Sequence, residues 1–173
     1  MWATSNPHAI NETPLHAEKV GVWCAISRLR IIGPIFFHDT VNTDRYLHIF
    51  TEFVNQLDDI ELRNGYFQQD GATCHTSNDS MTHIRSFFGD RLISKGLWPP
   101  RSPDLTPPDF FLWGLLKGKV YANKPRTTAD LEENIKREIA AVDAGTLQRT
   151  FENMERRVRK CLEVGGGHFQ HLL

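Results

Sequence analysis

A cluster of prolines near the middle of the chain limits its fold more than any other feature. Five prolines fall within the eleven residues 98–108. Because proline has a fixed φ and no backbone N–H, this segment can form neither a helix interior nor a central strand. We therefore predict a stiff loop that ends in a helix start, with Thr106 as N-cap, Pro107 in the first helical position and Asp109 in the first turn.

Strands are predicted on both sides of a first helix. Residues 19–27 alternate between apolar and other side chains, and residues 30–37 form a second apolar run after a very short link. The two segments predict an antiparallel hairpin, in which Gly33-Pro34 makes a bulge or an edge position. Two further short strands are expected at 66–69 and 91–94.

Helices are predicted wherever apolar residues recur at helical spacing. They are expected after a cap at Asn42 or Thr43, over about 79–88, from the end of the proline loop, after Thr127 or Thr128, and over about 146–163, where Leu147, Phe151, Met154, Val158 and Leu162 should face the core. The order of elements predicts an α/β fold: one mixed sheet flanked by helices, with a helical C-terminal tail, in a single domain spanning 1–173.

Composition excludes several classes of protein. The net charge of -1 gives no global basic surface, so any contact with DNA must come from local patches. The three cysteines lie far apart without a C-x-x-C pair, which supports neither a disulfide framework nor a zinc knuckle. No apolar run approaches the roughly 20 residues of a membrane span, so we expect no membrane partner.

Two acidic residues, Asp70 and Asp109, are candidates for a functional site. Asp70 follows a short predicted strand, and that end of a strand borders the ligand crevice in open sheets. Each acid also has a structural explanation, since Asp70 can form an Asx turn and Asp109 can cap its helix. The 38 intervening residues can return Asp109 to the end of the strand that carries Asp70. Two carboxylates placed together there can share Mg²⁺.

Two ordered blocks carry a resemblance to a known family. Residues 67–76, F-Q-Q-D-G-A-T-C-H-T, are similar to the Q-D-x-A-x-x-H block of mariner/Tc1-type DDE transposases. Residues 98–113 look like the S-P-D-L-x-P-x-[DE] block of that family, and residues 19–27 look like its V-x-V-W strand. Residues 117–125 and 165–168 resemble the tail of one branch, so the likeness covers nearly the whole chain.

The resemblance implies an RNase H-like fold and metal-dependent DNA chemistry. By likeness, Asp70 and Asp109 are catalytic and metal-binding, with two Mg²⁺ or Mn²⁺ ions in the intact site, whereas Asp104 of S-P-D is not catalytic. It implies hydrolysis at transposon ends, followed by attack of a 3′-hydroxyl on target DNA. Location in the nucleus is expected, with DNA as the partner and a homodimer as one assembly.

Four residues near the acids are candidates for contact with DNA. His75, Arg101, Lys117 and Lys119 could each meet phosphate. The alternatives are a structural imidazole at His75 and ordinary surface charges at the three basic side chains. A basic stretch at 156–160 is a further candidate, with a solvated, ion-paired helix face as its alternative.

The sequence also departs from the family pattern. The first catalytic Asp and the helix-turn-helix domain of the family have no counterpart in residues 1–173, and neither Asp39 nor Asp44 fits the first-acid motif. We expect the first strand to be missing, which would expose an edge in the sheet. Little or no strand cleavage is expected from two carboxylates. The alternatives are a non-catalytic remnant or a domesticated module that binds nucleic acid or protein, and, on weaker grounds, a different RNase H-like nuclease.

Overall fold

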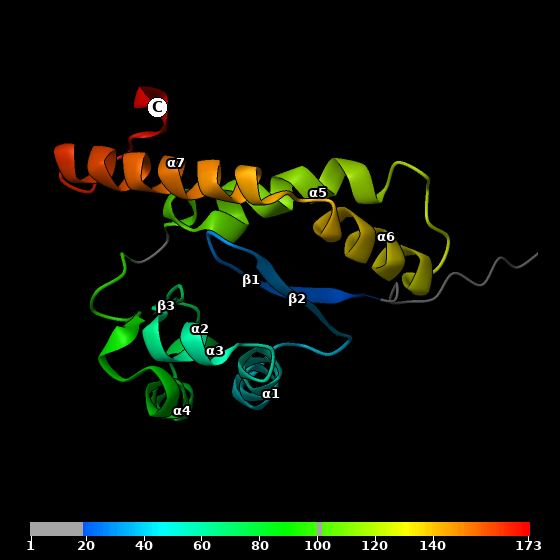
Figure 1. The fold of residues 1–173 in the computed structure, drawn as a ribbon, viewed down its shortest axis with the longest axis horizontal. Coiled ribbons are helices and arrows are strands. Elements are labelled where there is room, and N and C mark those ends of the chain that lie inside the picture. The colour runs from blue at the N-terminus through cyan, green and yellow to red at the C-terminus, as the bar shows by residue number, and fades with distance from the viewer. Residues whose placement is uncertain (1–18, 100–101) are drawn as a thin grey trace, which may run out of the picture.

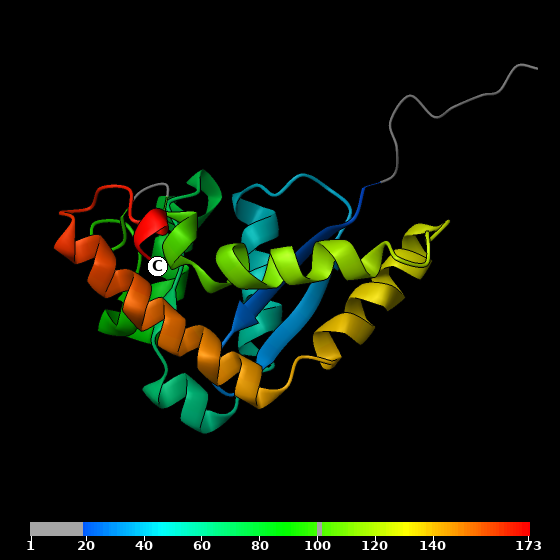
Figure 2. The same ribbon diagram turned by 90° about the horizontal axis from the view of Figure 1, so that it is seen from above.

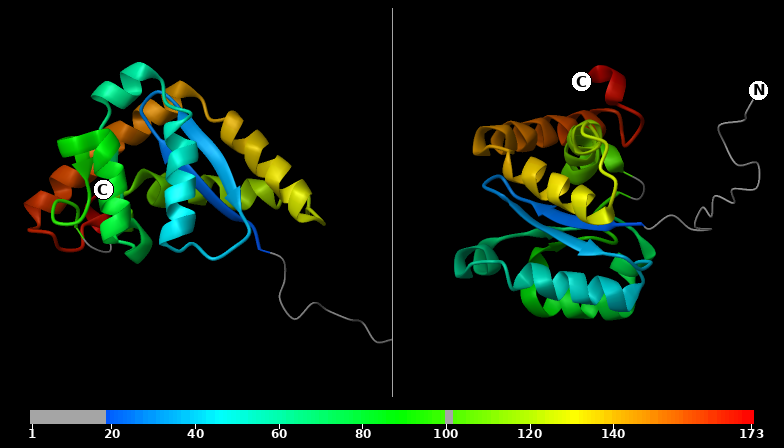
Figure 3. Two further views of the ribbon diagram at one scale, coloured as in Figure 1. Left: turned by 90° about the horizontal axis from the view of Figure 1, so that it is seen from below. Right: turned by 90° about the vertical axis from the view of Figure 1, so that its right-hand side faces the viewer.

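The computed structural model describes residues 19–99 and 102–173. A central hairpin lies between two layers of helices (Figures 1 and 3). The strands are β1 (Gly21–Ile26), β2 (Ile31–Phe37), β3 (Phe67–Gln68) and β4 (Leu92–Ile93). The helices are α1 (Thr43–Val54), α2 (Asp59–Asn64), α3 (Thr73–Thr76), α4 (Asn78–Phe88), α5 (Trp113–Val120), α6 (Thr128–Ala140) and α7 (Ala144–Glu163). Three short 3₁₀ helices, η1 (Gly89–Arg91), η2 (Pro103–Leu105) and η4 (Gln170–Leu172), and a π-helix, η3 (Pro108–Leu112), complete the described elements.

The predicted antiparallel hairpin is present. β1 and β2 pair with a register shift between Trp23 and Ala25, opposite a cis Gly33-Pro34 peptide, so the predicted irregularity is confirmed. The two faces of the hairpin belong to different apolar cores. Ile32 and Ile35 pack with α1 and α4, whereas Cys24 packs with α5 and α6.

The strands form two small sheets instead of the one sheet that the sequence predicts. β3 pairs in parallel with β4, and neither strand pairs with the β1–β2 hairpin. The fold class remains a mixture of strands and helices. Residues of β1 and β3, one strand from each sheet, line the cavity described below.

Aromatic packing holds α1 against the second sheet. Phe50 is fully buried, and its ring meets Phe53, Phe67 and Phe88 at centroid separations of 5.3–6.2 Å. Burying one such ring stabilises the fold by about 1.5–3 kcal/mol relative to leaving it exposed. This core therefore fixes the position of β3, the strand that leads to Asp70.

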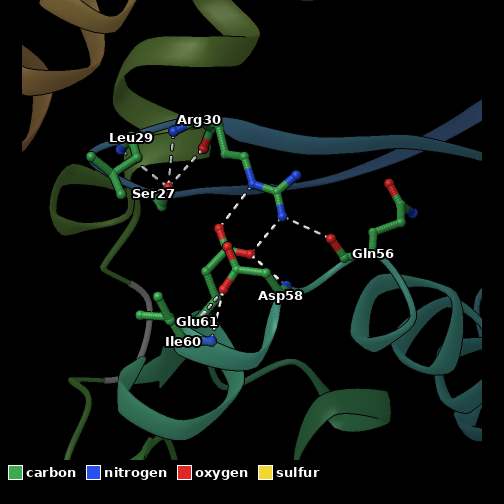
Figure 4. A network of polar contacts seen from close by, with 7 residues as sticks. All are labelled: Ser27, Leu29, Arg30, Gln56, Asp58, Ile60 and Glu61. Atoms are coloured by element: carbon green, nitrogen blue, oxygen red, sulfur yellow. Dashed lines mark hydrogen bonds and ion pairs between the residues drawn. The ribbon is translucent and has the colours of Figure 1, made fainter.

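An ion pair fastens the hairpin to α2 (Figure 4). Arg30 donates to both carboxylate oxygens of Glu61, at 2.8 and 2.5 Å, and to the carbonyl of Gln56 at 2.7 Å. Glu61 also completes a capping box with Asp58, which starts α2 where the sequence predicted no separate helix. The arginine holds the pKa of Glu61 below its ordinary value through the hydrogen bond, so this carboxylate is committed to structure.

Helix ends follow the sequence prediction in part. Asn42 caps α1 and Thr127 caps α6, as expected. Leu162 was predicted to face the core but is 75% exposed, because the last turn of α7 lies at the periphery of the molecule (Figures 1 and 2). Within the described ranges, no helix combines the length and the apolar character that crossing a bilayer would require.

Candidate active site

A cavity of about 360 Å³ lies between the two sheets. β1 and β3 form two of its walls, and α7 contributes Phe151 and Met154. The end of β3 supplies Asp70, and the helix start after the proline loop supplies Asp109. The chain therefore brings both predicted carboxylates to one cavity.

Asp70 is held in place by two hydrogen bonds. Its Oδ1 accepts from the backbone N–H of Ala72 at 3.0 Å and from Nδ1 of His75 at 2.5 Å. The bond from His75 is the main reason why the pKa of Asp70 lies below its ordinary value. The predicted Asx turn is thus present, yet half of the side chain, 48%, stays exposed and open to a ligand.

Asp109 occupies a different environment. It lies in the first turn of η3, where its backbone N–H donates to the carbonyl of Thr106 at 2.9 Å. Burial, followed by the negative charge of Asp70, raises the pKa of Asp109 above its ordinary value. The negative charge of Asp70 therefore interacts with Asp109.

The predicted capping role of Thr106 is wrong. Its hydroxyl donates to the carbonyl of Ser102 at 3.2 Å, and this helix start has no side-chain cap. The adjacent η2 turn explains the difference, because it brings the Ser102 carbonyl within reach of the hydroxyl. Because no side chain caps this helix start, the carboxylate of Asp109 is available to bind a ligand.

The two carboxylates repel each other, and a cation between them would relieve that repulsion. Their separation stays a prediction, at roughly 4–8 Å for a shared metal pair. Across the described residues, no group of three His, Cys, Asp or Glu side chains is placed to hold a metal ion. The site as described offers two protein ligands.

A buried polar network supports the end of β3 and was not predicted from the sequence. Gln69 accepts from the hydroxyl of Tyr46 at 2.6 Å and donates to Ser94 Oγ at 3.0 Å and to the His75 carbonyl at 2.9 Å. The ring of Tyr46 also packs on the imidazole of His75, with centroids 4.2 Å apart. The signal in the sequence was a glutamine directly before Asp70, at the end of a buried strand.

The candidate DNA contacts fall into three groups. His75 lines the cavity and bonds the carboxylate of Asp70, not backbone. Lys117 and Lys119 are exposed on α5 outside the cavity lining, and Lys119 lies 3.9 Å from Glu138. Arg101 lies outside the described residues. Their contact with DNA stays a prediction.

Arg157, within the basic stretch 156–160, has a structural role. Its guanidinium lies 4.4 Å from the ring centroid of Phe110 and donates to the carbonyl of Asp104 at 3.0 Å. Both contacts reach the segment around Asp109. The arginine therefore fastens α7 to the loop that presents this carboxylate.

Comparison with known proteins shows related transposases. No protein-family model matches the chain. It is 30% identical over 150 residues to the Tc3 transposase of Caenorhabditis elegans, which covers 85% of this chain and 44% of that protein. It is also 30% identical over 105 residues to the Tc1 transposase of the same organism, covering 60% of this chain and 36% of that protein. The chain thus spans less than half the length of these relatives.

Solved transposase structures have the same fold as this chain. The Mos1 transposase catalytic domain with raltegravir and Mg superposes with a TM-score of 0.74 at 20% identity, covering 87% of this chain and 76% of that one. This is a mariner/Tc1-type transposase catalytic domain by sequence and by fold. A Mos1 mariner paired-end complex with Mn superposes with a TM-score of 0.73 at 18% identity, covering 97% and 51%. The RNase H-like fold class is therefore confirmed.

Proposed function

We propose that this mariner/Tc1-type domain is built for metal-dependent cleavage and joining of transposon DNA in the nucleus, with Asp70 and Asp109 as metal ligands. One observation carries the proposal: the two carboxylates from the two sequence blocks line one cavity, where burial, followed by the charge of Asp70, raises the pKa of Asp109. The related transposases and the Mos1 complexes with transposon ends support DNA as the partner.

The donor set fits a divalent ion of the Mg²⁺ type. Mg²⁺ takes oxygen ligands and commonly binds through one or two carboxylates together with substrate phosphates. Oδ1 of Asp70 accepts both hydrogen bonds, and among the described residues no hydrogen bond engages its other carboxylate oxygen. Bound divalent ions would supply charge that stabilises the attacking and leaving oxygens of a phosphodiester. The protein residues position that charge: Gln69 fixes the strand end, and His75 orients Asp70.

We also propose that the chain as it stands cleaves DNA weakly or not at all. Glu61 is the third carboxylate of the cavity lining, but Arg30 already binds both of its oxygens. Two ligands position metal less firmly than three, and such positioning supplies much of the barrier reduction. The alternative function is a non-catalytic module that keeps the fold and binds DNA or protein. Pairing of two transposon ends would call for a homodimer, which light scattering in the presence of end DNA would detect.

The experiment separates metal binding from cleavage. Mn²⁺ binding is followed by electron paramagnetic resonance for the full chain and for Asp70→Asn, Asp109→Asn and Asp79→Asn. Asp79 is the matched control, because it is also an exposed acid in the first turn of a helix. We expect the first two substitutions to weaken Mn²⁺ binding by about tenfold or more and the control to leave it unchanged.

Two outcomes would contradict these proposals. Equal Mn²⁺ affinity in all four proteins would remove Asp70 and Asp109 as a metal site. Robust Mg²⁺-dependent nicking of terminal-repeat DNA that Asp70→Asn abolishes would refute the expectation of weak cleavage, while keeping the metal site.

A further inference from the structure

The segment that follows α7 turns back beside this helix. Gly165 and Gly166 have φ values of 62° and 81°, which glycine adopts without strain, and the N–H of Gly166 donates to the Cys161 carbonyl at 2.8 Å. This turn ends α7 and directs the next residues away from the helix axis (Figures 1 and 2). The segment 168–173 contains the short 3₁₀ helix η4.

Phe169 anchors this segment to the rest of the molecule. Its side chain is 4% exposed, whereas His168 and His171 are exposed. Burial of one phenylalanine side chain stabilises the fold by about 1.5–3 kcal/mol. The N–H of Leu172 also donates to the Phe169 carbonyl at 2.8 Å and closes the first turn of η4. The two exposed histidines therefore project from an ordered turn.

The imidazole rings of His168 and His171 lie against each other. Their centroids are 5.8 Å apart and their planes differ by 24°. In a 3₁₀ turn, side chains three residues apart lie on the same face, which explains the contact. Within the described residues, ion pairs and hydrogen bonds of histidine rings involve His38 and His75 instead. The ring nitrogens of this histidine pair are therefore not committed to an acid.

Two imidazoles at this separation suit a single transition-metal ion. Zn²⁺ binds histidine nitrogen at about 2.0–2.1 Å in tetrahedral geometry, which places the centroids of two ligating rings roughly 5 Å apart. The observed 5.8 Å exceeds this separation by less than about 1 Å. Because both histidines are exposed, rotation about their side-chain bonds closes the difference without a change in the core.

The donor atoms of this pair select a different ion from the carboxylates of the cavity. Imidazole nitrogen suits zinc, copper and nickel, whereas carboxylate oxygen suits magnesium and manganese. Among the described residues, no third His, Cys, Asp or Glu side chain joins the pair, so water completes the coordination of a bound ion. The histidine pair is therefore expected to bind Zn²⁺ in preference to Mg²⁺.

We propose that His168 and His171 form a surface binding site for a transition-metal ion of the Zn²⁺ type. The turn after α7 and the buried ring of Phe169 hold the two imidazoles close before the ion arrives. The ion then replaces a ring contact with two metal–nitrogen bonds and restrains the segment 168–173. The site concerns ion binding and does not depend on Asp70, on Asp109 or on DNA cleavage.

The test is a Zn²⁺ titration of the ¹⁵N-labelled full chain, followed by nuclear magnetic resonance of the imidazole nitrogens in excess Mg²⁺. Mg²⁺ competes for carboxylates but not for imidazoles. We expect the nitrogens of His168 and His171 to shift together and to saturate at one equivalent of Zn²⁺. His168→Gln and His171→Gln should each weaken Zn²⁺ binding by at least about tenfold. His48→Gln, which changes an exposed histidine on α1, is the matched control and should leave the affinity unchanged.

A variant with a shifted histidine tests whether the two rings act together. Gln170→His combined with His171→Gln keeps the composition and moves the second imidazole by about 120° around the 3₁₀ turn, so we expect Zn²⁺ binding to weaken by at least about tenfold. Equal Zn²⁺ affinity in this variant or in His168→Gln would overturn the proposal. A shift of the His75 nitrogens without any shift at His168 and His171 would also overturn it, because Zn²⁺ would then occupy the cavity of Asp70. The spectra of the backbone amides show that each variant is folded.

Discussion

The hydroxyl of Tyr46 is the best place to test how the fold supports the site. Tyr46 is 1% exposed and Gln69 is 5% exposed, and their 2.6 Å hydrogen bond lies beneath the strand end that carries Asp70. Burial is the largest cause that raises the pKa of the Tyr46 hydroxyl, so it remains a neutral donor near pH 7. Tyr46→Phe removes this donor and keeps the ring that packs on His75.

The magnitude follows from what the substitution leaves behind. The Gln69 oxygen becomes a buried acceptor without its partner, which costs about 1–3 kcal/mol of unfolding free energy. The amide nitrogen stays anchored by Ser94 and by the His75 carbonyl, so Gln69 cannot turn toward solvent without losing those bonds. For a domain of this size, a loss of about 2 kcal/mol lowers the midpoint of thermal unfolding by roughly 4–8 °C.

Urea unfolding monitored by circular dichroism measures this loss of stability. An unchanged m-value would indicate that both proteins expose the same surface area when they unfold. Tyr66→Phe is the matched control, because Tyr66 is 70% exposed and its loss of a hydroxyl should change stability by less than about 0.5 kcal/mol. If Tyr46→Phe is as stable as this control, the network under Asp70 does not support the strand end.

Two further predictions concern charge and packing. Asp109 has a raised pKa, so its charged form destabilises the fold at pH 7; Asp109→Asn should raise the unfolding free energy by less than about 1 kcal/mol after solvent screening. That gain should vanish near pH 3, where the carboxyl is protonated in both the folded and the unfolded chain. Urea midpoints measured at pH 7 and at pH 3 test this, and a variant less stable than the original protein at pH 7 would contradict the reasoning. Phe50→Ala should cost about 3–5 kcal/mol by opening a cavity among the aromatic rings that surround it, and a loss below about 1 kcal/mol in urea unfolding would show that this core repacks.

Local rules predicted much of the fold because the deciding interactions lie close in sequence. The hairpin follows from alternation over 19–37, and its irregularity from Gly33-Pro34. Asn42 and Thr127 cap their helices through hydrogen bonds to residues three positions away. Asp70 and Asp109 were found because each lies in a distinctive block with a fixed spacing, and the structure brings both to one cavity.

Features set by tertiary contacts could not be predicted in this way. Whether four short strands form one sheet or two depends on edges that meet only in the folded chain, and β3 and β4 have two residues each. Thr106 fits a capping pattern, yet its hydroxyl donates to the Ser102 carbonyl and this helix start has no side-chain cap. The role of Arg157 depends on a contact 53 residues away, which no local pattern contains.

The carboxylate pair is the point where stability and ligand binding oppose each other. His75 stabilises the charge on Asp70, and burial, followed by this charge, raises the pKa of Asp109. Without a cation, the folded chain therefore keeps two like charges in one cavity. Such an arrangement lowers the stability of the free protein, and a cation-bearing ligand recovers that loss when it binds. A divalent ion bound by both carboxylates is therefore expected to raise the free energy of unfolding.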